Sequence, residues 1–269
     1  MRKADSEPVS AELQQAREIA GTDGNAFHAK VATYFRDRAW SVLISPYYVD
    51  NATGQAREID LLCEQLFSFR LHREDGYGIY RIQLFVECKY LVAPVVFWFD
   101  ERDQKRTLEW LDQKTPFSWG RTSSHRAHRY INSGTRVAKL FRGGSDSHDP
   151  IYKGLAQSLG ALIQRRGRPL LDRPTNERGD PAAEVAVQYP VIVCGGDANL
   201  YRADIGSDPS SVLPAAPQMF QLEVDYAYTR GDRISEDYFL IDVLRFGELD
   251  SLLGLLDREA REAIQLLSG

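Results

Sequence analysis

The sequence lacks several features that would place it in a familiar class at once. No apolar run approaches the roughly 18 residues of a membrane-spanning helix, and residues 1–24 contain no apolar core of a secretory signal. A Gly-x-x-x-x-Gly-Lys-Ser/Thr phosphate loop is also missing, which argues against intrinsic ATP use. We therefore expect a cytoplasmic protein without a membrane partner.

Cysteine is scarce, and its placement argues against a zinc site. Cys63, Cys88 and Cys194 lie far apart in apolar runs, without the paired spacing of zinc ligands. We expect them to be reduced thiols in the core. His125 and His128 have a ligand-like spacing, but no acid or cysteine lies near them in the sequence. We therefore expect these histidines to contact phosphate or solvent.

The remaining composition is that of an ordinary globular protein, with 269 residues, 43% hydrophobic and 26% charged. A chain of this length can bury a substantial core in one large domain. We expect a flexible, polar lead-in at residues 1–22. Residues 23–269 are expected to form a single domain with an insertion at about residues 100–150.

Hydrophobic periodicity predicts an α/β protein. Helices are expected at residues 23–38, 103–111, 151–166 and 248–267. Strands are expected at residues 40–48, 57–70, 80–90, 94–99, 185–194, 219–229 and 238–246. The segment after 103–111 is expected to be irregular with one helix, and residues 195–218 are expected to form a long loop.

One stretch of the chain is strongly basic, although the net charge is −5. Residues 113–145 contain no Asp or Glu but many cations, with aromatic residues and histidines between them. A run of charge is often only a solvated face, yet this pattern favours a surface that contacts phosphates. The residues predicted to bind nucleic acid are Arg121, Arg126, Arg129, Arg136 and Lys139.

Three charged residues occur inside two of the predicted apolar strands. Asp60 interrupts the strand at residues 57–70, and Glu87 and Lys89 interrupt the strand at residues 80–90. Because side chains alternate along a strand, Glu87 and Lys89 point to one face. Carboxylates in apolar surroundings are costly unless a partner or a cation neutralises them. The pattern indicates either a structural ion pair or, as we favour, a functional site in which Asp60 and Glu87 converge.

These residues resemble the motif of the PD-(D/E)xK nuclease superfamily, which has the restriction-endonuclease-like fold. Asp60 matches the first acid of that motif, Glu87 the second and Lys89 the lysine. The resemblance covers residues 24–90, and residues 151–194 look like the family's later helix and strand. It implies an α/β fold with a restriction-endonuclease-like αβββαβ core, a mixed sheet flanked by helices. To this core the chain would add a basic insertion and C-terminal strands and a helix.

The resemblance also implies further site residues. Cys88 lies at the variable position whose main-chain carbonyl often joins the metal shell in the family. Gln157, together with Lys153, occupies a helical face where many members carry a Gln or Lys, although a solvated helix face is an equal alternative. Many members have a Glu on the first helix, where this chain has His28. That histidine either replaces the missing ligand or is an ordinary, partly exposed helix residue.

The function implied by the resemblance is Mg²⁺-dependent hydrolysis of a nucleic acid, with DNA as the expected substrate and Mn²⁺ as a substitute for Mg²⁺. Asp60, Glu87 and the carbonyl of Cys88 would bind the metal, while Lys89 and Gln157 would act in catalysis. A bacterial restriction, defence or repair role is implied, and the oligomeric state is open, a homodimer included. The alternative is a binding or scaffold domain of the same fold that has lost its activity.

Overall fold

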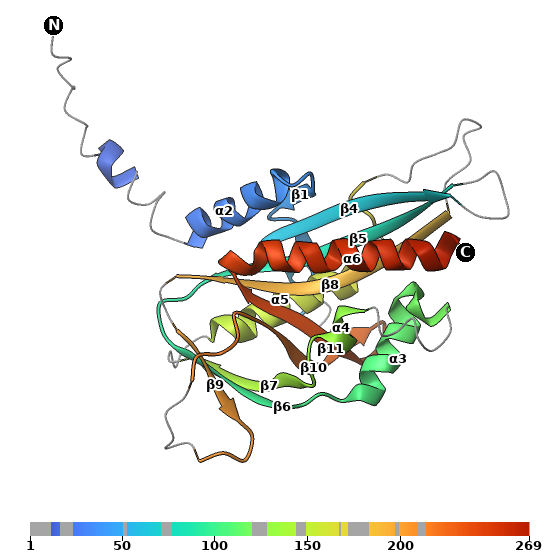
Figure 1. Cartoon of the computed structure of the whole chain (residues 1–269). Helices are drawn as coiled ribbons and strands as arrows, with labels where there is room; N and C mark the ends of the chain where they lie inside the picture. The colour runs from blue at the N-terminus through green and yellow to red at the C-terminus, as the bar shows by residue number, and fades with distance from the viewer. Residues whose placement is uncertain are drawn as a thin grey trace, which may run out of the picture.

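The computed structural model describes residues 12–16, 24–50, 53–70, 77–119, 128–143, 149–166, 168–171, 183–196, 199–208 and 214–268. The protein is an α/β protein built on one large mixed sheet with helices packed against it (Figure 1). Within these segments, no helix is both long and apolar enough to cross a bilayer. Most of the predicted lead-in at residues 1–22 lies outside the described residues, and its described part, residues 12–16, is helical.

The first part of the chain forms a helix followed by strands, as its periodicity predicts. The helix buries Phe27 and Phe35 at a helical spacing of its apolar residues. The elements are α2 (Gly24–Arg36), β1 (Ser41–Ile44), β2 (Tyr47–Val49), β3 (Ala56–Glu58), β4 (Leu61–Arg70) and β5 (Tyr77–Tyr90).

Two segments that were predicted as single strands, residues 40–48 and 57–70, are each divided in two. Ser45 has a positive φ of 53°, a conformation that a regular strand does not allow, and Pro46 follows it. The segment paired with it is interrupted opposite Ser45, between β3 and β4. Ser45 N donates to Asp60 O at 2.8 Å across this break. The two halves therefore stay paired while β2 and β3 form a separate two-stranded sheet.

The rest of the chain also follows the periodicity in most places, with three differences. The basic stretch contains a strand, β7, the predicted loop at residues 195–218 contains β9, and β11 begins earlier than expected. The elements are β6 (Val95–Glu101), α3 (Gln104–Lys114), α4 (Arg129–Asn132), β7 (Arg136–Gly143), α5 (Pro150–Gln164), β8 (Ala183–Gly195), β9 (Leu200–Asp204), β10 (Met219–Arg230), β11 (Arg233–Arg245), the 3₁₀ turn η3 (Phe246–Glu248) and α6 (Leu249–Ser268).

The large sheet has nine strands in the order β1-β4-β5-β8-β11-β10-β7-β6-β9. At one end, β1, β4 and β5 are antiparallel neighbours, and β8 then joins β5 in parallel. Next, β11 is parallel to β8 and pairs with β10 in a long antiparallel hairpin. Strands β5, β8 and β11 therefore run in the same direction at the middle of the sheet.

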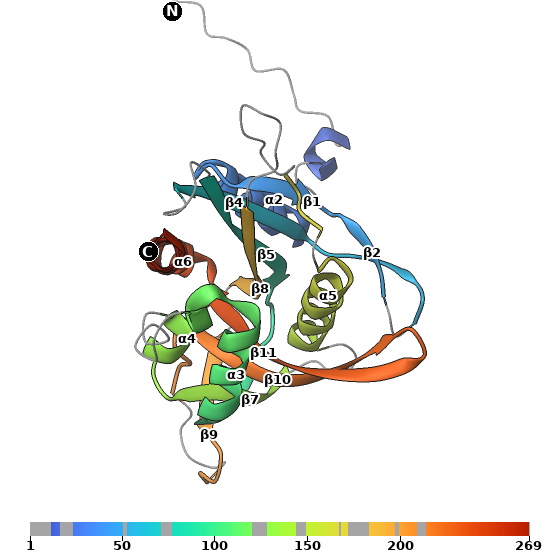
Figure 2. The same ribbon diagram turned by 90° about the vertical axis from the view of Figure 1, so that its right-hand side faces the viewer.

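Helices cover both faces of this middle region. On one face α5 packs through Leu155 and Leu159 onto side chains that include Phe85 of β5. On the other face α2 and α6 pack against a second apolar cluster, which includes Val86 of β5. Figure 2 shows α5 and α6 on opposite sides of β5 and β8. Successive residues of β5 consequently face different helices, as strand alternation requires.

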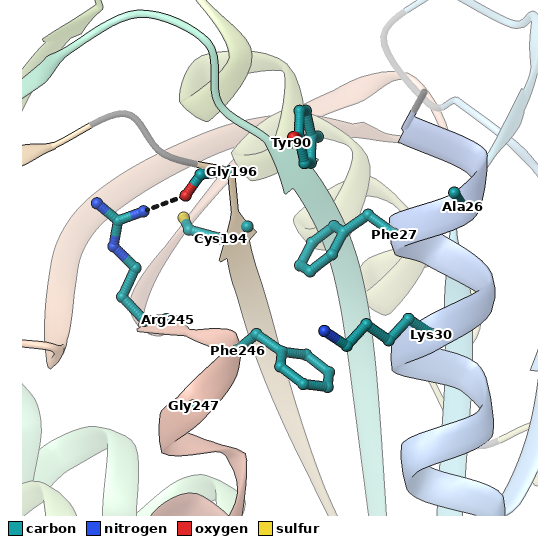
Figure 3. Close-up of a pocket in the computed structure, with 10 residues that line it drawn as sticks. Ala26, Phe27, Lys30, Tyr90, Cys194, Gly196, Arg245, Phe246 and Gly247 are labelled. Atoms are coloured by element: carbon teal, nitrogen blue, oxygen red, sulfur yellow. Dashed lines mark hydrogen bonds between the residues drawn. The ribbon is translucent and has the colours of Figure 1, made fainter. Parts of the chain in front are cut away.

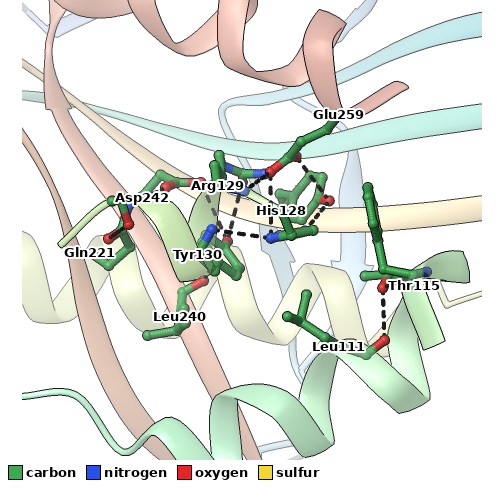
Figure 4. Close-up of polar contacts among 12 residues, drawn as sticks. Leu111, Thr115, His128, Arg129, Tyr130, Gln221, Leu240, Asp242 and Glu259 are labelled. Atoms are coloured by element: carbon green, nitrogen blue, oxygen red, sulfur yellow. Dashed lines mark hydrogen bonds and ion pairs between the residues drawn. The ribbon is translucent and has the colours of Figure 1, made fainter. Parts of the chain in front are cut away.

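A buried polar network joins the short helix α4 to this frame (Figure 4). Arg129 is only 2% exposed, and its guanidinium lies 2.6 Å from a carboxylate oxygen of both Asp242 on β11 and Glu259 on α6. Its charged carbon also lies 4.0 Å from the ring centre of Tyr189. The prediction that Arg129 binds nucleic acid is therefore wrong: both of its acidic partners are distant in sequence, and its charge is used within the core.

We expect Arg129→Ala to lower the free energy of unfolding by about 3–5 kcal/mol, because it leaves two buried carboxylates without their cation. Arg261→Ala is the control, since Arg261 is 72% exposed and pairs with Asp257 on the surface of α6. The control should change stability by less than about 0.5 kcal/mol. Urea denaturation of both variants measures the difference. Equal midpoints would show that the network does not stabilise the fold.

Candidate active site

The break before β4 brings Asp60 beside Glu87. In the antiparallel ladder Leu61 pairs with Val86, so the residue before Leu61 lies next to the one that follows Val86. Asp60 N donates to Glu87 Oε1 at 3.3 Å, and the carboxylate of Asp60 accepts a 2.7 Å bond from Cys88 N. The predicted convergence of the two acids is therefore found.

Glu87 and Lys89 lie on the α5 face of the sheet and form an ion pair. Lys89 Nζ is 2.5 Å from Glu87 Oε2, and the two side chains are 12% and 0% exposed. Burial raises the pKa of the Glu87 carboxyl from 4.5 to about 8; Asp60 adds to the rise, whereas Lys89 opposes it. The ionised form of Glu87 is thus disfavoured by its surroundings, and a second nearby cation would stabilise it.

Helix α5 supplies Gln157, the fourth predicted catalytic residue. Lys89 Nζ donates to Gln157 Oε1 at 3.4 Å, and Gln157 Nε2 donates to the main-chain oxygen of Glu58 at 2.8 Å. The amide therefore connects the lysine to the end of β3. Lys153, the other candidate on this helix, is exposed.

Gly154 of α5, a residue that the sequence analysis did not select, leaves room for the side chain of Lys89. A Cβ at Gly154 would lie 2.8 Å from Lys89 Cε and 3.6 Å from Glu87 Cβ. Real Cβ atoms do not approach another atom as closely as 2.8 Å. An isolated glycine inside a predicted helix was the available signal, because such a residue often has a packing role.

His28 on α2 contacts the site, but not as a replacement carboxylate. Its Nε2 lies 2.7 Å from the main-chain oxygen of Asp60. A carbonyl oxygen can only accept, so Nε2 carries the proton in this contact and is not available as a metal ligand. The histidine instead fixes the backbone of Asp60.

The donor set suits a hard cation that keeps part of its water shell. Asp60 and Glu87 offer carboxylate oxygens, and Cys88 can offer only its carbonyl, because burial raises the pKa of its thiol well above the usual value. Among the described residues, no group of three or more His, Cys, Asp or Glu is placed to bind a metal. Mg²⁺ is commonly bound by one or two carboxylates with water and phosphate, so the residues present fit Mg²⁺.

No family model, curated protein or solved structure matches this chain. The interpretation of the site therefore depends on its own geometry.

The described cations of the basic stretch on β7 are not assembled at this site. Arg136 pairs with Asp204 at 2.9 Å, and Lys139 pairs with Glu223 at 2.7 Å. Both cations lie on β7, which four other strands separate from β4 in the sheet. Acidic residues that are distant in sequence thus neutralise two of the cations of the basic stretch. Arg121 and Arg126 lie outside the described residues, as does His125.

The buried Glu87 predicts a specific dependence of stability on pH. Because its folded-state pKa is raised, its contribution to stability is fully present below about pH 4.5 and is lost as pH rises towards 8. In EDTA, the free energy of unfolding should fall over this range by on the order of a few kcal/mol more in the wild type than in Glu87→Gln. Urea denaturation at several pH values measures this.

Glu109→Gln is the matched control, because the Glu109 side chain is 55% exposed. Its pH dependence should parallel that of the wild type. If Glu87→Gln also parallels the wild type, the carboxylate of Glu87 is not destabilised by its surroundings.

Proposed function

We propose that this protein is a metal-dependent endonuclease of the PD-(D/E)xK type that hydrolyses nucleic acid, with DNA as the substrate. The observation that carries the proposal is the convergence of Asp60, Glu87, Lys89 and Gln157 from three separate elements. An ion pair alone would not require the second acid or the glutamine from another helix.

The order of the elements around the site supports the same proposal. Helix α2 is followed by β1, β4 and β5 as antiparallel neighbours, then by α5 across one face and by β8 in parallel with β5. We take this order as support for an αβββαβ core. The elements β6, α3, α4 and β7 lie between β5 and α5 in the chain, and we propose that the insertion at about residues 100–150 belongs to this part.

In the proposed mechanism, Asp60 and Glu87 would hold Mg²⁺, with the carbonyl of Cys88 as a further oxygen ligand. When bound, the ion supplies Lewis acidity and makes water a better nucleophile. Lys89 extends its ammonium into the same space, where it can orient the water and stabilise the charge that develops on the phosphate. Gln157 restricts the position of Lys89 through its hydrogen bond.

The second candidate function is that of a nucleic-acid-binding or scaffold domain with the same fold and no turnover. It is favoured by the direct contact between Lys89 and Glu87, which partly neutralises the carboxylate without a metal. A restriction, defence or repair role belongs to the first proposal and would not follow from the second. Catalytic assays separate the two.

We expect Asp60→Asn, Glu87→Gln and Lys89→Ala each to reduce Mg²⁺-dependent cleavage of plasmid DNA by on the order of 10²–10³-fold or more, since each removes charge at the reacting phosphate. Gln157→Ala, which acts through Lys89, should cost about 10–100-fold. Lys105→Ala is the control, because Lys105 is 86% exposed on α3. EDTA should abolish cleavage by the wild type, and cleavage that persists in EDTA would overturn the role of the metal.

Gly154→Ala should impair cleavage without unfolding the protein. The added methyl group meets the flexible end of Lys89, so the lysine moves away from Glu87 and Gln157 rather than the helix moving from the sheet. Activity should fall about 10–100-fold. Helix propensity favours alanine by up to about 1 kcal/mol, which offsets the cost to stability. Gly254→Ala on α6, where no atom outside the neighbouring helix backbone lies within 4 Å of the added carbon, should leave activity unchanged.

A further inference from the structure

A cavity outside the candidate active site lies at the ends of the central strands, on the face of the sheet opposite α5. This cavity of about 400 Å³ opens between the first turns of α2 and the carboxyl ends of β5, β8 and β11 (Figure 3). Ligands of α/β proteins commonly bind outside the carboxyl ends of parallel strands, and the volume lies within the usual range for small-molecule sites.

Three aromatic rings line this cavity. Phe27 from α2 lies 6.3 Å from Tyr90 and 6.0 Å from Phe246, measured between ring centres, with interplanar angles of 58° and 69°. None of these pairs is stacked face to face. Tyr90 is 44% exposed, so its ring lies at the solvent side of the cavity. The arrangement leaves aromatic surface to which a flat ring can bind.

The charged residues of the cavity are cations. Lys30 lies with its Nζ 4.4 Å from the ring centre of Phe246, and Arg245 donates a long 3.4 Å bond to the main-chain oxygen of Gly196. The residues that line the cavity include no Asp or Glu. A ligand that carries both a flat ring and a negative charge therefore matches the lining.

The end of β8 forms a wall without side chains. A Cβ at Gly195 would lie 2.5 Å from the Phe27 ring, and a Cβ at Gly196 would lie 2.3 Å from the main-chain oxygen of Leu91. Gly196 also has a φ of +86°, which favours glycine. A larger residue at either position would displace the aromatic ring or the backbone that shapes the cavity.

At two points of the chain, a residue that lines the cavity is directly adjacent in sequence to a residue at the candidate active site. Phe27 lines the cavity, while the next residue, His28, contacts Asp60. Tyr90 lines the cavity, while the preceding residue, Lys89, belongs to the active site on the opposite face of β5. The two sites are therefore adjacent along α2 and at the end of β5.

We propose that this cavity binds one unpaired nucleotide of the substrate, with its base against the aromatic rings and its phosphate near Lys30 and Arg245. The inference rests on the proposed function, which supplies both the nucleic acid as partner and the cleaved bond beside the cavity. A base inside a duplex must leave the stack to reach such a cavity. The protein is thus expected to act on single-stranded, terminal or extruded nucleotides next to the cleaved bond.

The test is the binding of deoxyadenosine 5′-monophosphate, deoxyadenosine and inorganic phosphate, each followed by NMR or calorimetry in EDTA. EDTA prevents a metal at Asp60 and Glu87 from retaining the phosphate. The nucleotide should bind at least about tenfold more tightly than either fragment, because only the nucleotide contacts both the rings and the cations. Binding of the nucleotide no tighter than binding of phosphate alone would overturn the proposal.

Tyr90→Ala should weaken nucleotide binding by at least about fivefold, the lower range for loss of a base–aromatic contact. Lys30→Gln should also weaken it and should reduce its salt dependence. Both side chains are exposed, so neither change is expected to unfold the protein. Tyr152→Ala and Lys105→Gln are the matched controls at exposed positions outside the cavity. Equal weakening by the controls would place the nucleotide elsewhere.

The test of the nucleotide site can be separated from the test of the proposed nuclease activity. Glu87→Gln should lose cleavage and keep nucleotide binding, because Glu87 does not line the cavity. If the wild type does not cleave but Tyr90→Ala and Lys30→Gln weaken binding, the nuclease proposal fails and the nucleotide site stands. If the wild type cleaves and neither substitution affects nucleotide binding, the nucleotide site fails alone.

Discussion

The antiparallel pairing of β4 with β5 is the interaction on which the rest of this structure depends. Its register places Asp60 beside Glu87, and the same ladder gives β5 the edge to which β8 adds in parallel. A slip of one residue would turn every side chain of β4 to the other face and would separate the two acids. The apolar residues on both faces oppose such a slip, since Leu61 and Leu62 belong to different core clusters. The same register of β4 on β5 is therefore required both for the packing of the core and for the geometry of the site.

At the candidate active site, the fold buries a charged group at an energetic cost. Glu87 is fully buried beside a second carboxylate, and Lys89 and the main-chain N–H of Asp60 oppose the penalty. Charged groups of this kind are expensive in apolar surroundings and often mark function rather than stability. The network around Arg129 also has two acids and one cation, but there one guanidinium contacts both acids, whereas Lys89 contacts Glu87. Burial of charge alone does not distinguish the two cases, whereas the sharing of the cation between both acids does.

Local patterns in the sequence predicted most of the helices and strands and also the residues that converge at the site. Apolar periodicity is a local property, and Asp60, Glu87 and Lys89 interrupt it visibly. The predictions were wrong where contacts between segments distant in sequence determine the structure. Arg129 was assigned to a surface because its partners, Asp242 and Glu259, are remote in sequence. The division of the strands at Ser45 depends on a backbone conformation that residue type alone does not specify. The aromatic cavity combines α2 with the ends of three strands, so no single motif could indicate it.

The strand order has a consequence for the growing polypeptide on the ribosome. Strand β6 follows β5 directly in the chain, yet β8, β11, β10 and β7 all lie between them in the finished sheet. When β5 has been synthesised, the edge that β8 will occupy has no partner until residues 183–195 are made. Strands β6 and β7 must wait longer still, until β10 and β11 connect them to the rest. Nascent chains with open sheet edges are prone to associate with one another, and such long-range pairing is slow. The topology thus leaves edges of the central sheet unpaired during much of the synthesis of the chain.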